Sequence, residues 1–162
     1  MADKNLMKDK LVIRTGEAED VEAIAHFNIL TARETENREL AVETAVSGVK
    51  AVFEDSSKGF YLVAEQEDEI VGQLMVTDEW SDWNNKYYFW IQSVYVRGDY
   101  RKRRVFSRLY RHLLDMARIR GDVISVRLYV EKDNRTAKRV YESLGMAQSI
   151  YRMYEISGFD NY

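Results

Sequence analysis

The sequence predicts a mixed α/β fold, and two observations carry that prediction. Runs rich in β-branched and aromatic residues follow one another in the first half of the chain with polar turns between them, which is typical of an antiparallel meander. The last of these runs leads through a short basic loop into a segment whose apolar residues recur at helical spacing, and a further strand-like run follows. Because a helix links these two strands, we expect them to run parallel.

The first half of the chain should hold two helices and four strands. Val21, Ile24 and Ala25 recur at helical spacing in the first helix, as Val42 and Ala45 do in the second. The expected ranges are, in order, a strand at 11–13, helices at 19–34 and 40–53, and strands at 60–65, 70–77 and 86–96. The polar segment DEWSDWNN, residues 78–85, is the expected turn between the last two strands.

The second half should hold two helices and two strands. A helix from the basic loop to Arg120 should end at Gly121, since glycine is the usual residue after a helix C-terminus. A strand is expected over Ile124 to Val130, a helix over 135–144 that stops at Gly145, and a last strand over 149–156.

Composition narrows the classes of function. A chain of 162 residues with 46% hydrophobic and 31% charged residues is expected to form one domain over 11–162 after a loose polar tail, 1–10. The N-terminus has no apolar signal-like run, which favours a cytoplasmic protein, and no apolar run is long enough to span a membrane. The absence of Cys excludes catalysis or metal binding by a cysteine thiolate. The two His do not have the spacing of metal ligands, so no metal is expected.

The stretch VYVRGDYRKRRVFSRLY, residues 94–110, carries the strongest functional signal. A helix that begins after this loop points free backbone N–H groups and the positive end of its dipole at the loop, which is a site for phosphate. Arg101, Lys102, Arg103 and Arg104 add positive charge. The run from Arg101 to Arg111 also fits a nucleic-acid patch, but the net charge of −3 argues against that alternative.

This strand, loop and helix resemble the acetyl-CoA-binding segment of the GNAT superfamily of N-acetyltransferases. The usual loop pattern there is Arg or Gln, two residues, Gly, one residue, and Gly or Ala. Arg101 matches its start, whereas Arg104 and Phe106 stand where the two glycines would be. Downstream, VRLYVEKDNRTAKRVYESLGM resembles a second segment of the family, on the residues Asn134, Tyr141, Leu144, Gly145 and Met146. The resemblance covers roughly residues 11–156.

The resemblance implies a GNAT-type fold, with a central mixed sheet of six or seven strands and about four helices. Its parallel strands, here Trp90 to Val96 and Ile124 to Val130, would splay apart to admit the pantetheine arm of acetyl-CoA. The coenzyme would then contact the backbone of one strand, the loop with the helix start, and the head of the last helix. The residues implied are Val94, Tyr95, Val96, Arg101, Lys102, Arg103, Arg104, Val105, Phe106, Ser107 and Asn134.

The implied reaction is acetyl transfer to a primary amine of a small molecule or peptide, by direct attack in a ternary complex. Tyr141 would protonate the coenzyme thiolate, since a phenol and a thiol titrate close together. Glu79 would take the proton of the amine; Asp78, Tyr129, Glu131 and water alone remain alternatives for this base. The tryptophans Trp80, Trp83 and Trp90 are candidates for an acceptor pocket, with core packing or a dimer contact as the alternatives.

Three alternatives stay open. Tyr141 fits a packed core residue, and Asn134 fits a helix N-cap, for which Asn is preferred. The whole chain also fits a catalytically inactive GNAT-fold module that binds the coenzyme without turnover. A homodimer is left open as well.

Overall fold

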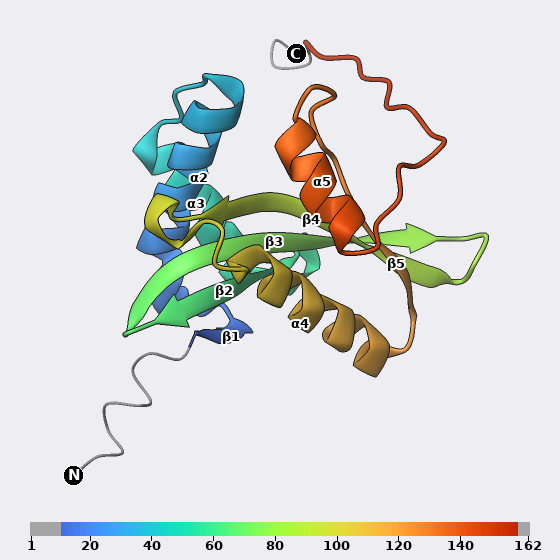
Figure 1. The fold of residues 1–162 in the computed structure, drawn as a ribbon, viewed down its shortest axis with the longest axis horizontal. Coiled ribbons are helices and arrows are strands. Elements are labelled where there is room, and N and C mark those ends of the chain that lie inside the picture. The colour runs from blue at the N-terminus through green and yellow to red at the C-terminus, as the bar shows by residue number, and fades with distance from the viewer. Residues whose placement is uncertain (1–10, 159–162) are drawn as a thin grey trace. The chain divides into compact units, whose positions relative to one another are not determined.

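The computed structural model describes residues 11–158, in two compact units that divide between Tyr129 and Val130. The expected loose tail, 1–10, lies outside the described residues. The first unit carries a five-stranded sheet whose order follows the chain (Figure 1). Its strands are β1 (Val12–Thr15), β2 (Phe60–Gln66), β3 (Glu69–Ser81), β4 (Lys86–Val96) and β5 (Val123–Leu128).

The strand pairing confirms the predicted mixed sheet. β1, β2, β3 and β4 pair with one another in antiparallel fashion, as a meander, whereas β4 and β5 pair in parallel. The α-helices of the described residues are α2 (Val21–Glu36), α3 (Val42–Glu54), α4 (Val105–Arg120) and α5 (Arg135–Ser143), of which α5 belongs to the second unit. Gly121 ends α4, as predicted, and its φ of 77° is a left-handed conformation that glycine adopts readily.

Two neighbouring residues of β3 reveal that helices cover both faces of the sheet. The amide of Gln73 donates a hydrogen bond to Oδ1 of Asn28 in α2 at 2.8 Å. A Cβ at Gly72 would instead come 3.0 Å from Cγ1 of Val105 in α4. Because consecutive residues of a strand point to opposite faces, α2 and α4 lie on opposite faces of the sheet.

Each face has an apolar core. On the α2 and α3 side, Ile24, Val49 and Val63 are almost completely buried. On the α4 side, Leu109 and Leu113 have no exposed surface, and they share the helical spacing that predicted this helix. The absence of a side chain at Gly72 lets the first turn of α4 approach the sheet closely beside the end of β4.

Two sequence predictions about strands are wrong. Residues 149–156 form no strand, so the described sheet has five strands instead of six or seven. A strand needs a partner for its backbone groups, and an apolar sequence does not guarantee one. The expected turn over 78–85 is also wrong in part, because β3 continues through Ser81. Asp78, Glu79 and Trp80 pair with β4 and are strand residues.

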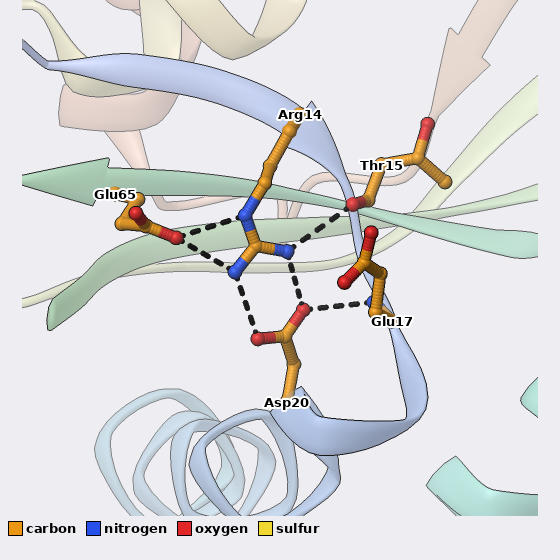
Figure 2. Close-up of polar contacts among 5 residues, drawn as sticks. All are labelled: Arg14, Thr15, Glu17, Asp20 and Glu65. Carbon is orange, nitrogen blue, oxygen red and sulfur yellow. Dashed lines mark hydrogen bonds and ion pairs between the residues drawn. The ribbon is translucent and has the colours of Figure 1, made fainter. Parts of the chain in front are cut away.

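An ion cluster around Arg14 of β1 ties this strand to the neighbouring β2 and to Asp20, which precedes α2 (Figure 2). The Arg14 guanidinium donates to both carboxylate oxygens of Asp20, at 2.6 and 2.9 Å, and to Glu65 in β2 at 2.8 Å. The Glu17 amide also donates to Asp20 at 2.8 Å. Burial alone would raise the pKa of Asp20, but the hydrogen bonds from Arg14 and Glu17 outweigh it and lower that pKa.

We expect Asp20→Asn to lower the free energy of unfolding by about 2 kcal/mol at pH 7, because it leaves the half-buried Arg14 without its closest anion. A carboxylate with a lowered folded-state pKa stabilises the protein above its unfolded pKa. The difference between the two proteins should therefore shrink as the pH falls below about 4. Urea unfolding at several pH values measures it. Asp115→Asn, which breaks the exposed pair with Arg118, is the control and should cost less than about 1 kcal/mol; equal losses would contradict the prediction.

Candidate functional site

The central feature of the candidate site is the point where β4 and β5 part. β4 pairs with β5 only from Tyr87 to Ile91, the latter opposite Leu128. It pairs with β3 along almost its whole length, to Val96. Among the described residues, 11–158, the second half of β4 thus has one edge without a strand partner. Two strands that separate in this way leave a row of backbone groups available to a ligand.

The backbone groups that face this opening follow from the ladder with β3. The Arg97 amide donates to the Val71 carbonyl at 3.0 Å, so Arg97 directs its N–H to β3. In an antiparallel ladder this direction alternates along the strand. Tyr95 therefore also turns its N–H to β3, whereas Val94 and Val96 turn theirs to the opening. Of the three strand residues predicted to contact the coenzyme, these two have the suitable backbone orientation.

A β-bulge precedes these residues. Leu74 pairs with Val94 and Val76 pairs with Ile91, so β4 advances three residues while β3 advances two. The extra residue lies at Gln92 or Ser93. A bulge bends its strand and shifts the facing of every side chain beyond it, which is why such features often lie beside active sites. No local pattern in the sequence indicates this bulge.

The loop before α4 keeps a glycine-like conformation without glycine. Arg104 precedes α4 with a φ of 62°, and Lys102 has a φ of 64°. Glycine adopts this left-handed region without steric cost, whereas other residues are strained there. Phe106, at the second glycine position, lies inside α4 and stacks on Tyr110 instead. The first turn of α4 thus begins where the resemblance expects it.

Arg101 is engaged within the protein. Its guanidinium forms an ion pair of 2.5 Å with Glu34 in α2, and its Nε donates to the Val96 carbonyl at 3.0 Å. Tyr95 donates to the other oxygen of Glu34 at 3.3 Å. The hydrogen bond to Glu34 raises the pKa of Arg101, so this side chain remains a cation. Arg101 therefore links the loop, the end of β4 and α2.

The other basic side chains divide into two groups. Lys102, Arg103 and Arg104 are exposed beside the start of α4. Arg108 instead donates to the Leu11 carbonyl at 2.6 Å and serves the attachment of β1. Arg101 and Arg108 are thus engaged in contacts within the protein, whereas the three exposed side chains lie beside a helix N-terminus, a position that favours phosphate.

The two predicted carboxylates of β3 point to opposite faces. Asp78 pairs with Arg120 of α4 at 2.6 Å. Glu79 lies on the other face, where its carboxylate accepts a hydrogen bond from the Trp90 indole and lies 3.5 Å from Arg127. The ion pair of Glu79 is thus longer than that of Asp78. Of the two carboxylates, Glu79 is the one that shares a face with Trp90 and Arg127 of the two parting strands.

The tryptophans do not form one pocket lining. Trp80 packs edge-on against Tyr87, and Trp83 is 90% exposed in the turn after β3. Trp90 stacks on Tyr129, with ring centroids 4.6 Å apart, beside Glu79. Only Trp90 accompanies a candidate base, and sequence reasoning missed Arg127, which completes the group.

The second unit holds the remaining predicted residues. Oδ1 of Asn134 accepts the Ala137 amide at 3.0 Å, so Asn134 is the N-cap of α5. Burial raises the pKa of the Tyr141 phenol above its usual value. The Glu131 carboxylate accepts the Asp133 amide at 2.7 Å in the turn before the helix.

Within residues 11–158, no three side chains are grouped as a metal site would require. Over the same range, no helix has the length and apolar character to cross a membrane.

Comparisons with known proteins agree on one family. The model of the acetyltransferase (GNAT) family matches residues 23–146, which is most of the chain. The crystal structure of a possible acetyltransferase from Clostridium difficile 630 is 42% identical in sequence, with a TM-score of 0.87, and the match covers 92% of this chain and 98% of that one. No curated protein sequence matches significantly.

More distant structures share the fold alone. A ribosomal-protein-alanine N-acetyltransferase from Brucella melitensis biovar Abortus 2308 is 17% identical, with a TM-score of 0.75 over 92% of this chain and 100% of that one. An aminoglycoside N-acetyltransferase in complex with CoA is 10% identical, with a TM-score of 0.77 over 91% and 95% of the two chains.

The left-handed Arg104 gives a prediction about the loop. Arg104→Gly relieves a strain of about 1–2 kcal/mol, but glycine also makes the unfolded chain more flexible by roughly 0.5–1 kcal/mol. We expect the free energy of unfolding to rise by about 0.5 kcal/mol. Ser107→Gly is the control, since Ser107 lies in right-handed α4, and it should lower stability by roughly 0.5–1 kcal/mol. Urea unfolding of both variants decides, and a similar loss in both would contradict the prediction.

Proposed function

The chain belongs to the GNAT acetyltransferase family, and from that premise we propose that it transfers an acetyl group from acetyl-CoA to a primary amine of a small molecule or peptide. The transfer is a direct attack in a ternary complex. The observation that carries the proposal is the opening between β4 and β5, which lies just before the loop and the N-terminus of α4. One continuous segment thus offers backbone donors for the pantetheine arm and a phosphate site.

The backbone of β4 supplies the first part of the chemistry. The N–H groups of Val94 and Val96 face the opening, where they pair with pantetheine amides or polarise the thioester carbonyl. A donor fixed in a strand stabilises the developing oxyanion without having to reorganise. The neighbouring Arg101 occupies the Val96 carbonyl, which leaves the N–H groups for the ligand.

The start of α4 supplies the second part. Its first-turn N–H groups, those of Val105, Phe106 and Ser107 among them, and the positive end of the helix dipole attract the coenzyme phosphates. The exposed Lys102, Arg103 and Arg104 add charge. We assign Arg101 a positioning role in the loop, because its guanidinium is already paired with Glu34.

Side chains supply the proton transfers. Glu79 takes a proton from the acceptor ammonium, and Tyr141 gives its phenolic proton to the departing thiolate. A phenol is protonated at neutral pH and can therefore donate, although burial raises the pKa of Tyr141 further above that of a thiol. From the family pattern we also assign Asn134, the N-cap of α5, a contact with the coenzyme.

Coenzyme binding tests the phosphate site. Lys102→Glu replaces an attraction to phosphate by a repulsion, so we expect the Kd of acetyl-CoA to rise at least roughly tenfold at low ionic strength. Lys50→Glu changes the net charge equally on an exposed position of α3 and should leave the Kd unchanged. Isothermal titration calorimetry measures both. No heat and no thermal shift with wild-type protein at millimolar coenzyme would overturn the proposed function.

Turnover tests the acid. Tyr141→Phe keeps the ring and removes the proton donor. At every pH from 6 to 9, kcat of the variant should therefore be about 10²-fold to 10⁴-fold below that of the wild type, with coenzyme affinity unchanged. Tyr154→Phe, at a tyrosine that is 92% exposed in the same unit, is the control and should retain full turnover. If Tyr141 only packs in the core, the variant should keep its kcat, and its free energy of unfolding should fall by about 1 kcal/mol.

A further inference from the structure

Five side chains form a mixed-charge aromatic cluster where β4 and β5 are last paired: Glu79, Tyr88, Trp90, Arg127 and Tyr129. The Glu79 carboxylate accepts from the Trp90 indole and lies 3.5 Å from the Arg127 guanidinium. The Arg127 guanidinium carbon lies 3.4 Å from the centroid of the Tyr88 ring. Trp90 and Tyr129 stack at 4.6 Å with an angle of 24° between their planes. These contacts join β3, β4 and the end of β5 on one face.

The cluster lies next to the opening. Trp90 pairs with Arg127, and the next pair, Ile91 with Leu128, is the last between the two strands. A thioester held between the parted strands would therefore lie beside this face. The carboxylate is the proposed base Glu79, so an amine bound here also meets the group that deprotonates it. The inference below thus rests on the proposed function.

The charges of the cluster discriminate among amines. It holds one carboxylate and one guanidinium, whose side chains are 45% and 33% exposed. Their separation of 3.5 Å is looser than the 2.6 Å between Asp78 and Arg120 on the opposite face. The pair is thus accessible, and neither partner is saturated by the other. A polycation would be attracted by Glu79 and repelled by Arg127, whereas a molecule with one charge of each sign satisfies both.

We propose that this cluster binds the acceptor, and that the acceptor is a free amino acid. The ammonium of the amino acid donates a hydrogen bond to Glu79, and its carboxylate accepts two hydrogen bonds from the planar guanidinium of Arg127. Its side chain lies against the stacked rings of Trp90 and Tyr129. A guanidinium is suited to this task because its donors match a carboxylate in two parallel hydrogen bonds. The rings favour side chains that are apolar or planar.

The reaction balances with these groups. The ammonium gives one proton to Glu79, and the nitrogen lone pair forms a bond to the acetyl carbonyl carbon. The carbon–sulfur bond then breaks, and the sulfur keeps the electron pair. The sulfur receives a proton from the proposed acid, Tyr141. The nitrogen loses a second proton, which restores the proton that Tyr141 gave. Glu79 releases its proton to water, so the products are an N-acetyl amino acid, free coenzyme thiol and one proton.

The test compares each amino acid with its own amide. Full-length protein is assayed for thiol release from acetyl-CoA with phenylalanine, methionine and tryptophan, with their carboxamides, and with spermidine. We expect kcat/KM for at least one amino acid to exceed that of its amide roughly tenfold or more, because the amide cannot form the ion pair with Arg127. Spermidine should be the poorest acceptor.

Arg127→Met then separates recognition from catalysis. This variant should raise KM for the amino acid much more than KM for its amide, so that the two values of kcat/KM converge. Arg127→Lys should restore part of the preference. Arg118→Met, at an exposed arginine of α4, is the matched control and should change neither ratio.

The possible outcomes are distinguishable. Amides or spermidine that react as well as the amino acids would overturn the amino-acid assignment and leave acetyl transfer intact. An unchanged preference in Arg127→Met would overturn the role of this cluster. Bound coenzyme with no thiol release from any of these amines would also overturn the assignment, whereas protein that binds no acetyl-CoA would remove the proposed function itself.

Discussion

The structure depends on how β4 is hydrogen-bonded. Its first half is paired on both edges and its second half on one, because β5 leaves it after Ile91. Backbone polar groups without partners are costly when buried, so an edge of this kind must be solvated or bind a ligand. Within the protein, the Val96 carbonyl is satisfied by Arg101. The remaining groups of the edge suit an extended ligand with amides of its own, which is the chemical character of pantetheine.

Contacts on both faces of the sheet hold this arrangement in place. On one face, the small Gly72 lets Val105 pack against β3, so α4 begins close to the end of β4. On the other face, the ion pair of Arg101 with Glu34 ties the loop to α2. The loop between these anchors must turn sharply, and Arg104 accepts a left-handed conformation to do so. Tertiary contacts thus override a local preference that glycine would have met.

Much of the fold was predictable because its signals are local. Helical spacing predicted α4, runs of β-branched and aromatic residues predicted the meander, and the helix between two strands predicted the parallel pair. The absent strand over 149–156 was not predictable, because a strand exists only with a partner and apolar residues do not specify one. The contacts of Arg101 with Glu34, 67 residues away, were equally hidden. Glu79 was a prediction from the sequence, but its neighbour Arg127 follows only from the register of three strands.

The bulge in β4 determines which side chains share a face with Glu79. On β3, Gln73 and Glu79 are six residues apart and point to the same side. Opposite Gln73 is Tyr95, which packs against Phe27 of α2, whereas opposite Glu79 is Tyr88. These two β4 residues are seven apart, and in a regular strand an odd separation would put them on opposite faces. The extra residue at the bulge reverses the alternation. One irregularity thus lets a single strand pack against a helix at one end and present Tyr88 and Trp90 beside a carboxylate at the other.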